Sequence, residues 1–135
     1  MSQENVEIVR RLIEAWGRGD YSAALDSIDS ELEVNASGGT PLDGTYRGHA
    51  GLAELMGAFW AEFEGQRIEI QEVIPTGSDV VLEVRFHGRG KRSGVEIEMG
   101  AWHVWSLRDG KAVRWRLLLT KQEALEAAGL AEYRK

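Results

Sequence analysis

The sequence predicts an α+β fold in which helices from the first half of the chain cover the concave face of a strongly curved antiparallel sheet. Apolar residues recur at helical spacing up to residue 63, and from residue 67 onwards they alternate with polar residues. Near the end of the chain, the pair Asp109-Gly110 separates two runs rich in Val, Leu and Trp. Asp-Gly favours the type I′ turn of a tight hairpin, so these runs are expected to form two long antiparallel strands.

Three helices are expected in the first half of the chain. Residues 6–16 carry apolar side chains at helical spacing, and the two glycines that follow mark the end of this helix. Residues 20–28 form a second, short helix with Asp20 or Ser22 near its N-cap. The third helix begins near residue 49 and presents a wide apolar stripe that must be buried. The stripe consists of Leu52, Leu55, Met56, Phe59, Trp60 and Phe63.

Strands, turns and one more helix account for the remaining segments. Alternating patterns predict strands at residues 32–36, 67–74, 80–86, 95–99 and 100–119, the last of these being the hairpin. Turn-rich segments are expected to connect them at residues 37–44, 75–79 and 88–94. A short helix at residues 121–130 is expected to close the chain.

The hairpin decides which side chains share a face of the sheet. With Asp-Gly in the turn, Trp102 pairs with Leu117 and Val104 pairs with Trp115. Just before the hairpin the apolar residues change from odd to even positions, which predicts a β-bulge near Gly100. The concave face then holds Leu82, Val84, Phe86, Ile97, Met99, Trp102, Val104, Val113, Trp115, Leu117 and Leu119. The opposite face of the hairpin holds His103, Trp105, Arg114 and Arg116.

Length and composition predict a single globular domain over residues 1–135. The net charge of −6 argues against binding to nucleic acid or to an anionic membrane surface. The chain has no cysteine, which excludes disulfides and cysteine metal sites, and His49 and His87 are not spaced like metal ligands, so no metal or cofactor is expected. Neither a signal peptide nor an apolar run of membrane-spanning length is evident, so a cytoplasmic location is expected.

Five motifs carry a resemblance to a known family. They are AWGRGD at 15–20, YRGHAGL at 46–52, GRGKRSGVE at 88–96, RDGKAVR at 108–114 and EALEAAGL at 123–130. With the order of elements described above, the chain resembles the nuclear transport factor 2-like (NTF2-like) superfamily. Within it, the chain is similar to the SnoaL-like group of polyketide cyclases and ketosteroid isomerase relatives. The resemblance implies a cone-shaped, cystatin-like roll with three N-terminal helices on the concave face of the sheet. It does not imply one reaction, because this scaffold hosts isomerases, cyclases, dehydratases, epoxide hydrolases and non-catalytic domains.

The resemblance also implies that the known catalytic groups are not retained. The oxyanion-hole tyrosine of ketosteroid isomerase falls on Leu12, its general-base aspartate on Asn35 and its protonated aspartate on Trp102. The acidic residue on the last strand of SnoaL-type cyclases falls near Leu117. None of these side chains can take up a proton near neutral pH, so a known site is not expected here.

The first functional hypothesis is therefore binding of a small hydrophobic molecule in an apolar pocket inside the cone. Asn35 is expected to orient a carbonyl or hydroxyl group of the ligand. The alternative is that the residues assigned to the pocket pack against one another as solid core and leave no cavity. The residues assigned to this pocket are Leu12, Trp16, Asn35, Met56, Phe59, Trp60, Trp102, Val104, Trp115, Leu117 and Leu119.

Two alternatives remain open at this point. The first is an isomerase, cyclase or dehydratase that uses a non-standard acid or base, with His103, Asn35 and Tyr46 as candidates. If the predicted bulge is misplaced, His103 faces the pocket and becomes the best general base, beside Arg116. The second is an interaction module without a ligand. A homodimer is expected in any case, with an interface formed by His103, Trp105, Arg114 and Arg116, because interfaces are enriched in aromatic residues and Arg.

Overall fold

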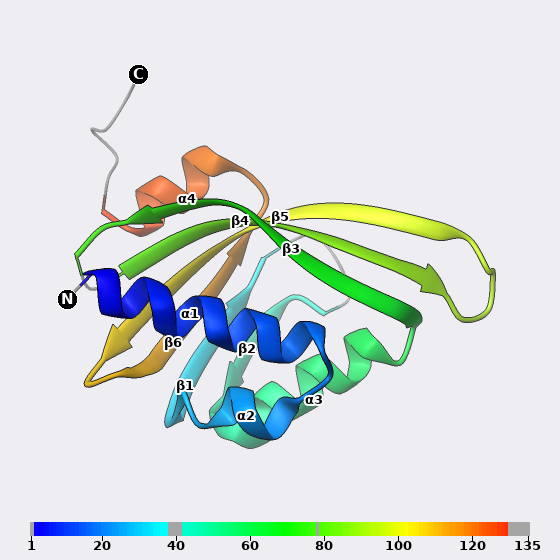
Figure 1. Ribbon diagram of the computed structural model, residues 1–135, viewed down its shortest axis with the longest axis horizontal. Coiled ribbons are helices and arrows are strands. Elements are labelled where there is room, and N and C mark those ends of the chain that lie inside the picture. Colours follow the sequence, from blue (N-terminus) through cyan, green and yellow to red (C-terminus); the bar gives the residue numbers. More distant parts are fainter. Residues whose placement is uncertain (1, 38–41, 78, 130–135) are drawn as a thin grey trace.

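The computed structural model describes residues 2–37, 42–77 and 79–129 and shows an α+β fold built on one six-stranded sheet (Figure 1). The helices of this part of the chain are α1 (Ser2–Gly17), α2 (Tyr21–Leu25), α3 (Gly48–Trp60) and α4 (Lys121–Ala127). The strands are β1 (Ile28–Ala36), β2 (Gly44–Arg47), β3 (Phe63–Pro75), β4 (Asp79–Gly90), β5 (Glu96–Arg108) and β6 (Lys111–Leu118). None of the helices within these described ranges is long and apolar enough to cross a membrane.

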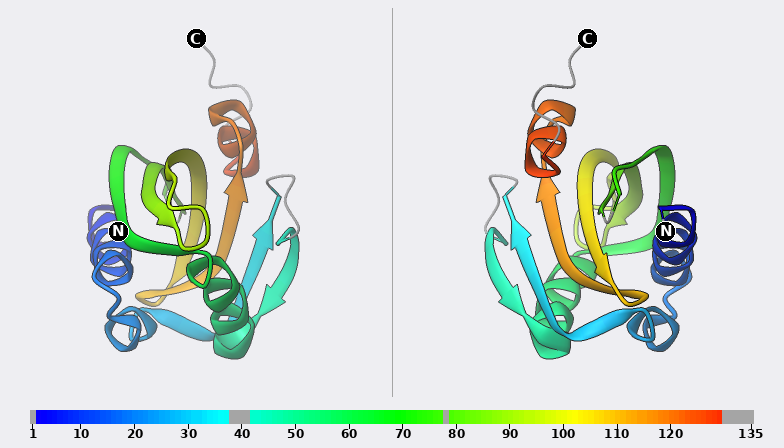
Figure 2. Two further views of the ribbon diagram at one scale, coloured as in Figure 1. Left: turned by 90° about the vertical axis from the view of Figure 1, so that its right-hand side faces the viewer. Right: turned by 90° about the vertical axis from the view of Figure 1, so that its left-hand side faces the viewer.

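The sheet has the order β2-β1-β6-β5-β4-β3, and α1 and α3 cover its inner face (Figures 1 and 2). All neighbouring strands are antiparallel except β1 and β6, which are parallel, so the sheet is mixed rather than wholly antiparallel. β2 and β3 form its two edges, and the sheet does not close. The predicted fold class is confirmed. The strand β2 was not predicted, and part of the loop predicted at 37–44 lies outside the described residues, at 38–41.

The end of α1 follows from its glycines. Gly19 has a φ of +78°, which favours glycine, and its N–H donates to the carbonyl of Trp16 at 2.9 Å. The N–H of Asp20 donates to the carbonyl of Ala15 at 2.8 Å, which completes a Schellman motif. The Asp20 carboxylate then accepts from the N–H of Ala23 and caps α2, as the sequence predicted. The chain therefore reverses within three residues and lays α2 beside the last turn of α1.

The register of the hairpin corrects the predicted bulge. β4 and β5 pair without a break from Asp79↔Ser106 to Arg89↔Glu96, so no bulge occurs at Gly100. The irregularity lies instead in β6, where Val113 is the extra residue. Because strand side chains alternate, this shift turns the residues of β5 to the face opposite the predicted one. Trp105 pairs with Trp115, and His103 pairs with Leu117.

Apolar side chains cover both faces of β5, which explains why the alternation was misread. On the inner face, Trp105 belongs to the large core cluster beneath α1 and α3. On the outer face, Trp102 and Val104 pack with Val81 and with Ala124 of α4 in a second, smaller cluster. Figure 2 shows α4 at the end of the molecule away from α2. Trp102 and Val104 therefore do not line the concave face, contrary to the prediction.

Candidate functional site

A groove with a volume of about 300 Å³ lies between the end of α1, α2 and α3. Its walls are largely apolar and carry the side chains of Trp16, Leu25, Leu52, Met56 and Trp60. The tight reversal after α1 places α2 here, and the apolar stripe of α3 faces it from the other side. Three residues that the sequence assigned to a pocket, Trp16, Met56 and Trp60, meet in this groove.

Two polar side chains also line the groove, Tyr21 and His49. Nε2 of His49 lies 2.9 Å from the carbonyl oxygen of Ile28, so the ring is tied to the start of β1. Partial burial raises the pKa of Tyr21 above its usual value. Among the residues that the structure describes, no Asp, Glu, Lys or Arg lines the groove. The sequence prediction missed both Tyr21 and His49, and the only local signal was the YRGH motif at the start of α3.

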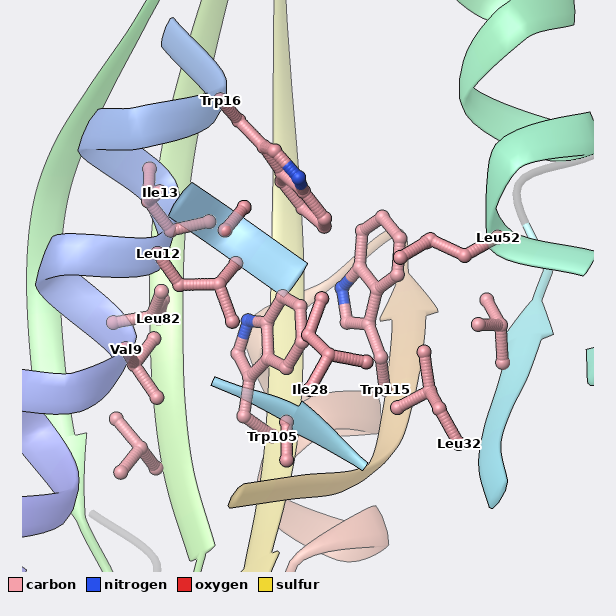
Figure 3. Close-up of a cluster of buried hydrophobic side chains, with 14 of the residues drawn as sticks. Val9, Leu12, Ile13, Trp16, Ile28, Leu32, Leu52, Leu82, Trp105 and Trp115 are labelled. Atoms are coloured by element: carbon pink, nitrogen blue, oxygen red, sulfur yellow. The ribbon is translucent and has the colours of Figure 1, made fainter. Parts of the chain in front are cut away.

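Three tryptophans lie among aliphatic side chains in the buried core cluster (Figure 3). The rings of Trp105 and Trp115 are stacked, with centroids 4.9 Å apart and planes 7° apart. Trp16 lies across both, with centroid distances of 5.6 Å to Trp105 and 5.0 Å to Trp115. All three side chains are buried. Trp16 thus has one side in the core and one side on the groove, which leaves the groove as the accessible part of the predicted pocket.

His103 lies on the inner face of β5 beside this cluster and is 6% exposed. Its ring contacts the rings of Trp115 and Trp105 edge-on, at centroid distances of 5.2 and 6.1 Å. Burial lowers the pKa of His103 to about 3, and its buried Nδ1 has no hydrogen-bond partner in the part of the chain that the structure describes. The interface position predicted for His103 is therefore wrong. It faces inward, as expected for a misplaced bulge, but it is not beside Arg116 and does not line the groove.

The other two candidate acid–base residues are engaged elsewhere. Asn35 is on β1, where its Oδ1 accepts from Nε of Arg114 at 3.0 Å. The amide nitrogen of Asn35 donates to Glu33 and to Thr45, at 3.2 Å in each case. The hydroxyl of Tyr46 donates to the carbonyl of Leu42 at 2.6 Å. Neither residue lines the groove. The pocket and catalytic roles predicted for Asn35 and the catalytic role predicted for Tyr46 therefore lack structural support.

The remaining residues assigned to the pocket are dispersed. Leu12 and Trp115 are fully packed in the large core, and Leu117 packs against its edge. Phe59 belongs to an aromatic cluster with Trp60, Phe63 and Phe86. Leu119 is 59% exposed at the end of β6.

The predicted interface residues do not form an exposed surface. Trp105 is fully buried in the core, because of the shifted register. Arg116 lies beneath α4, where it donates to the carbonyl of Ala127 at 2.7 Å and lies 3.6 Å from the carboxylate of Asp79. Burial, together with the charge of Arg114, lowers the pKa of Arg116. The placement predicted for Trp105 was therefore wrong, whereas Arg116 lies on the predicted outer face, and the homodimer itself stays a prediction.

A second recess, of about 240 Å³, lies on the outer side of the arm formed by β3, β4 and β5. It is polar, and several of its charged side chains are paired with neighbours. Arg89 lies 3.7 Å from Glu64, and Nε2 of His87 lies 3.1 Å from Glu69. The hydrogen bond with His87 lowers the pKa of Glu69. In the described ranges, no group of His, Asp and Glu residues is arranged to hold a metal ion.

Comparison with known proteins agrees with this architecture. A family model for a SnoaL-like domain matches residues 9–115. The structure of TerC co-crystallised with polyporic acid superposes with a TM-score of 0.77 at 24% identity, over 93% of this chain and 98% of that chain. An NTF2-like protein of unknown function from Burkholderia pseudomallei K96243 has a TM-score of 0.77 at 21% identity, over 91% and 95%. An NTF2-like protein from Burkholderia xenovorans LB400 has a TM-score of 0.70 at 29% identity, over 93% and 96%. No curated protein matches the sequence.

Proposed function

The chain belongs to the SnoaL-like domain family, and from this membership we propose that the groove between α1, α2 and α3 binds a small, flat, apolar molecule. The composition of the groove walls is the observation that carries this function. Trp16 and Trp60 contribute flat aromatic surface, and Leu52 and Met56 contribute aliphatic surface. Within the described ranges, no Asp, Glu, Lys or Arg lines the groove. Burial of apolar ligand surface there stabilises the complex by about 25 cal/mol per Å² before the costs of association.

The size of the groove supports a small ligand. Its volume of about 300 Å³ is at the lower end of the range of about 300–1,000 Å³ that is usual for small-molecule sites. The deeper part of the cone is occupied by Trp105 and Trp115, so the ligand lies against the helices rather than against the centre of the sheet. TerC, whose fold is similar, was co-crystallised with polyporic acid, so this fold can hold a small organic molecule.

Catalysis through His103 receives no support from its surroundings. A base with a pKa of about 3 binds a proton weakly, and no carboxylate orients this ring. Asn35 and Tyr46 already make hydrogen bonds within the protein. Binding is accordingly preferred to acid–base catalysis by these three residues.

A fluorescent, uncharged apolar probe, N-phenyl-1-naphthylamine, tests the binding function. The wild-type protein is expected to bind it with enhanced fluorescence, and Met56→Glu is expected to lower the affinity at least about tenfold, because a carboxylate then lies in an apolar wall. Leu119→Glu is the matched control, since Leu119 is exposed and does not line the groove. Equal affinity for both variants would contradict the assignment of the groove.

A homodimerising interaction module without a ligand is the second candidate, favoured by the tryptophan-filled cone. Native mass spectrometry in the presence of the probe separates the two candidates. A complex that carries the probe supports the binding function, whether the protein is a monomer or a dimer. A dimer that never carries the probe supports the interaction module.

A further inference from the structure

We infer that His49 is the hydrogen-bond acceptor of the groove and that the ligand is an uncharged aromatic molecule with a hydroxyl group. This hydroxyl group donates a hydrogen bond to Nδ1 of His49. This inference rests on the proposed function, because it assigns the polar group of the ligand that the groove binds. It adds what the apolar walls alone do not specify, namely the chemistry and the position of that polar group.

The tautomer of His49 is set by its contact with β1. A backbone carbonyl oxygen accepts hydrogen bonds and cannot donate them, so the contact of 2.9 Å requires a proton on Nε2. In the neutral imidazole the other nitrogen, Nδ1, then carries a lone pair and acts as an acceptor. Nδ1 makes no hydrogen bond to the described part of the chain, and it is not among the atoms buried without a partner.

The position of His49 is fixed by the backbone around it. Gly48 begins α3 with a φ of +68°, and a Cβ on this residue would lie 3.1 Å from the carbonyl oxygen of Ser30. The start of α3 therefore lies close against β1, and the imidazole ring reaches Ile28 from there. A ring held by the backbone at one nitrogen presents its other nitrogen in a defined direction, which is what selective recognition of one ligand atom requires.

The absence of charge in the groove limits the ligand group. None of the described lining residues is an Asp, Glu, Lys or Arg that would compensate an ammonium or a carboxylate group, so a charged ligand group would lack such a partner in a largely apolar site. A phenolic hydroxyl is uncharged at pH 7, with a pKa of about 10, and is a good donor to an imidazole nitrogen. The hydroxyl of Tyr21 is the only side-chain oxygen among the described lining residues, and it can itself donate or accept a hydrogen bond.

A pair of matched probes tests this assignment. 2-Naphthol carries the hydroxyl proton, and 2-methoxynaphthalene has the same ring and the same oxygen without that proton. Tryptophan fluorescence titrations of the wild-type protein are expected to show about tenfold tighter binding of 2-naphthol, the effect of one hydrogen bond in an apolar site. In the variant His49→Phe, whose side chain has no hydrogen-bond acceptor, the two probes are expected to bind with equal affinity. In the control variant His87→Gln, altered on the arm outside the groove, the tenfold preference is expected to persist.

Nitrogen-15 NMR of the histidine-labelled wild-type protein gives a second readout that does not depend on the folding of a variant. 2-Naphthol is expected to shift the Nδ1 resonance of His49 and to leave that of His103 unchanged, whereas 2-methoxynaphthalene is expected to shift neither. Equal binding of the two probes by the wild-type protein, or a preference for 2-naphthol without a shift at His49, would overturn the inference and leave the proposed function standing. Binding of neither probe would overturn both.

Discussion

His49 and His103 lie at two depths of the same fold, one on the wall of the helix-lined groove and one beside the buried tryptophans. His49 is partly exposed and tied by Nε2 to the carbonyl oxygen of Ile28. His103 is 6% exposed and packed edge-on against two indole rings, with no partner for Nδ1. The sequence favours His103 because it lies within a strand of the hairpin. In the structure, aromatic side chains bury the ring of His103, so a ligand cannot reach it.

The difference between the two sites is a difference between packing and recognition. The tryptophan cluster around His103 contributes mainly apolar burial and aromatic contacts, which stabilise the fold. The groove around His49 has less packing, and the ring of His49 is partly exposed there and tied to the carbonyl oxygen of Ile28. Substitutions in the cluster are therefore expected to change stability, and substitutions in the groove are expected to change binding.

The largest effect is expected for Trp115→Ala in the cluster. Trp115 is 3% exposed and stacks on Trp105, so its removal leaves a large cavity and is expected to lower the free energy of unfolding by about 3–5 kcal/mol. Trp60→Ala is the matched variant at the groove, where the ring is only partly buried, and a smaller loss is expected. Urea denaturation measures both. A larger loss for Trp60→Ala would reverse the assignment of the two regions.

The pH dependence of stability is the next largest effect. Burial lowers the pKa of His103 to about 3 in the folded state, whereas the unfolded chain has the ordinary value of about 6.5. Between these values the unfolded state binds more protons, so the stability is fully present above about pH 6.5 and is lost as the pH falls towards 3. The side chain of His103→Phe cannot take up a proton. Between pH 7 and pH 4 the free energy of unfolding of this variant is expected to fall by about 2–3 kcal/mol less than that of the wild-type protein. Urea denaturation of both proteins at the two pH values measures this difference. Equal losses in the wild-type protein and the variant would show that His103 is not buried in the folded protein.

The fold was predictable where the signals are local. The glycines after the first helix, the cap at Asp20 and the turn at Asp109-Gly110 each determine their own geometry within a few residues, and the structure confirms all three. The strand β2 has only four residues, too few for an alternation to stand out. Its pairing with β1 and the parallel pairing of β1 with β6 depend on contacts between distant parts of the chain.

The site was less predictable because it depends on register. A single extra residue, Val113, decides which face of the sheet His103 occupies, and no glycine marks it. Because α4 covers part of the outer face, apolar residues occur on both faces of β5. The alternation that includes Trp102 and Val104 therefore indicates the wrong face as the concave one. The groove is formed by three helices whose relative positions no local pattern specifies. The ring of His49, on the groove wall, is held by a contact with a strand residue more than twenty positions earlier in the chain.

A smaller effect is expected for Gly48→Ala at the start of α3. The positive φ of Gly48 and the approach of a new Cβ to Ser30 are expected to lower the free energy of unfolding by about 1–2 kcal/mol. The shift of the helix start also displaces His49, so the preference for 2-naphthol over 2-methoxynaphthalene is expected to fall, while His103→Phe leaves that preference intact. Thermal unfolding and fluorescence titration of the same samples measure both effects. A variant as stable and as selective as the wild-type protein would show that the ring of His49 is not held by this backbone segment.

The smallest effect, of opposite sign, is expected for Gly57→Ala in the same helix. A Cβ on Gly57 meets no atom within 4 Å, and this residue has no positive φ, so alanine is accommodated without strain. Alanine restricts the unfolded chain more than glycine does, and the variant is expected to gain about 0.5–1 kcal/mol in the free energy of unfolding. Gly57 lines the groove, so the new methyl group can narrow it and lower the affinity for both probes. The preference for 2-naphthol is expected to persist, because His49 is unchanged. Loss of the preference in this variant would mean that the shape of the groove, rather than the nitrogen of His49, selects the ligand.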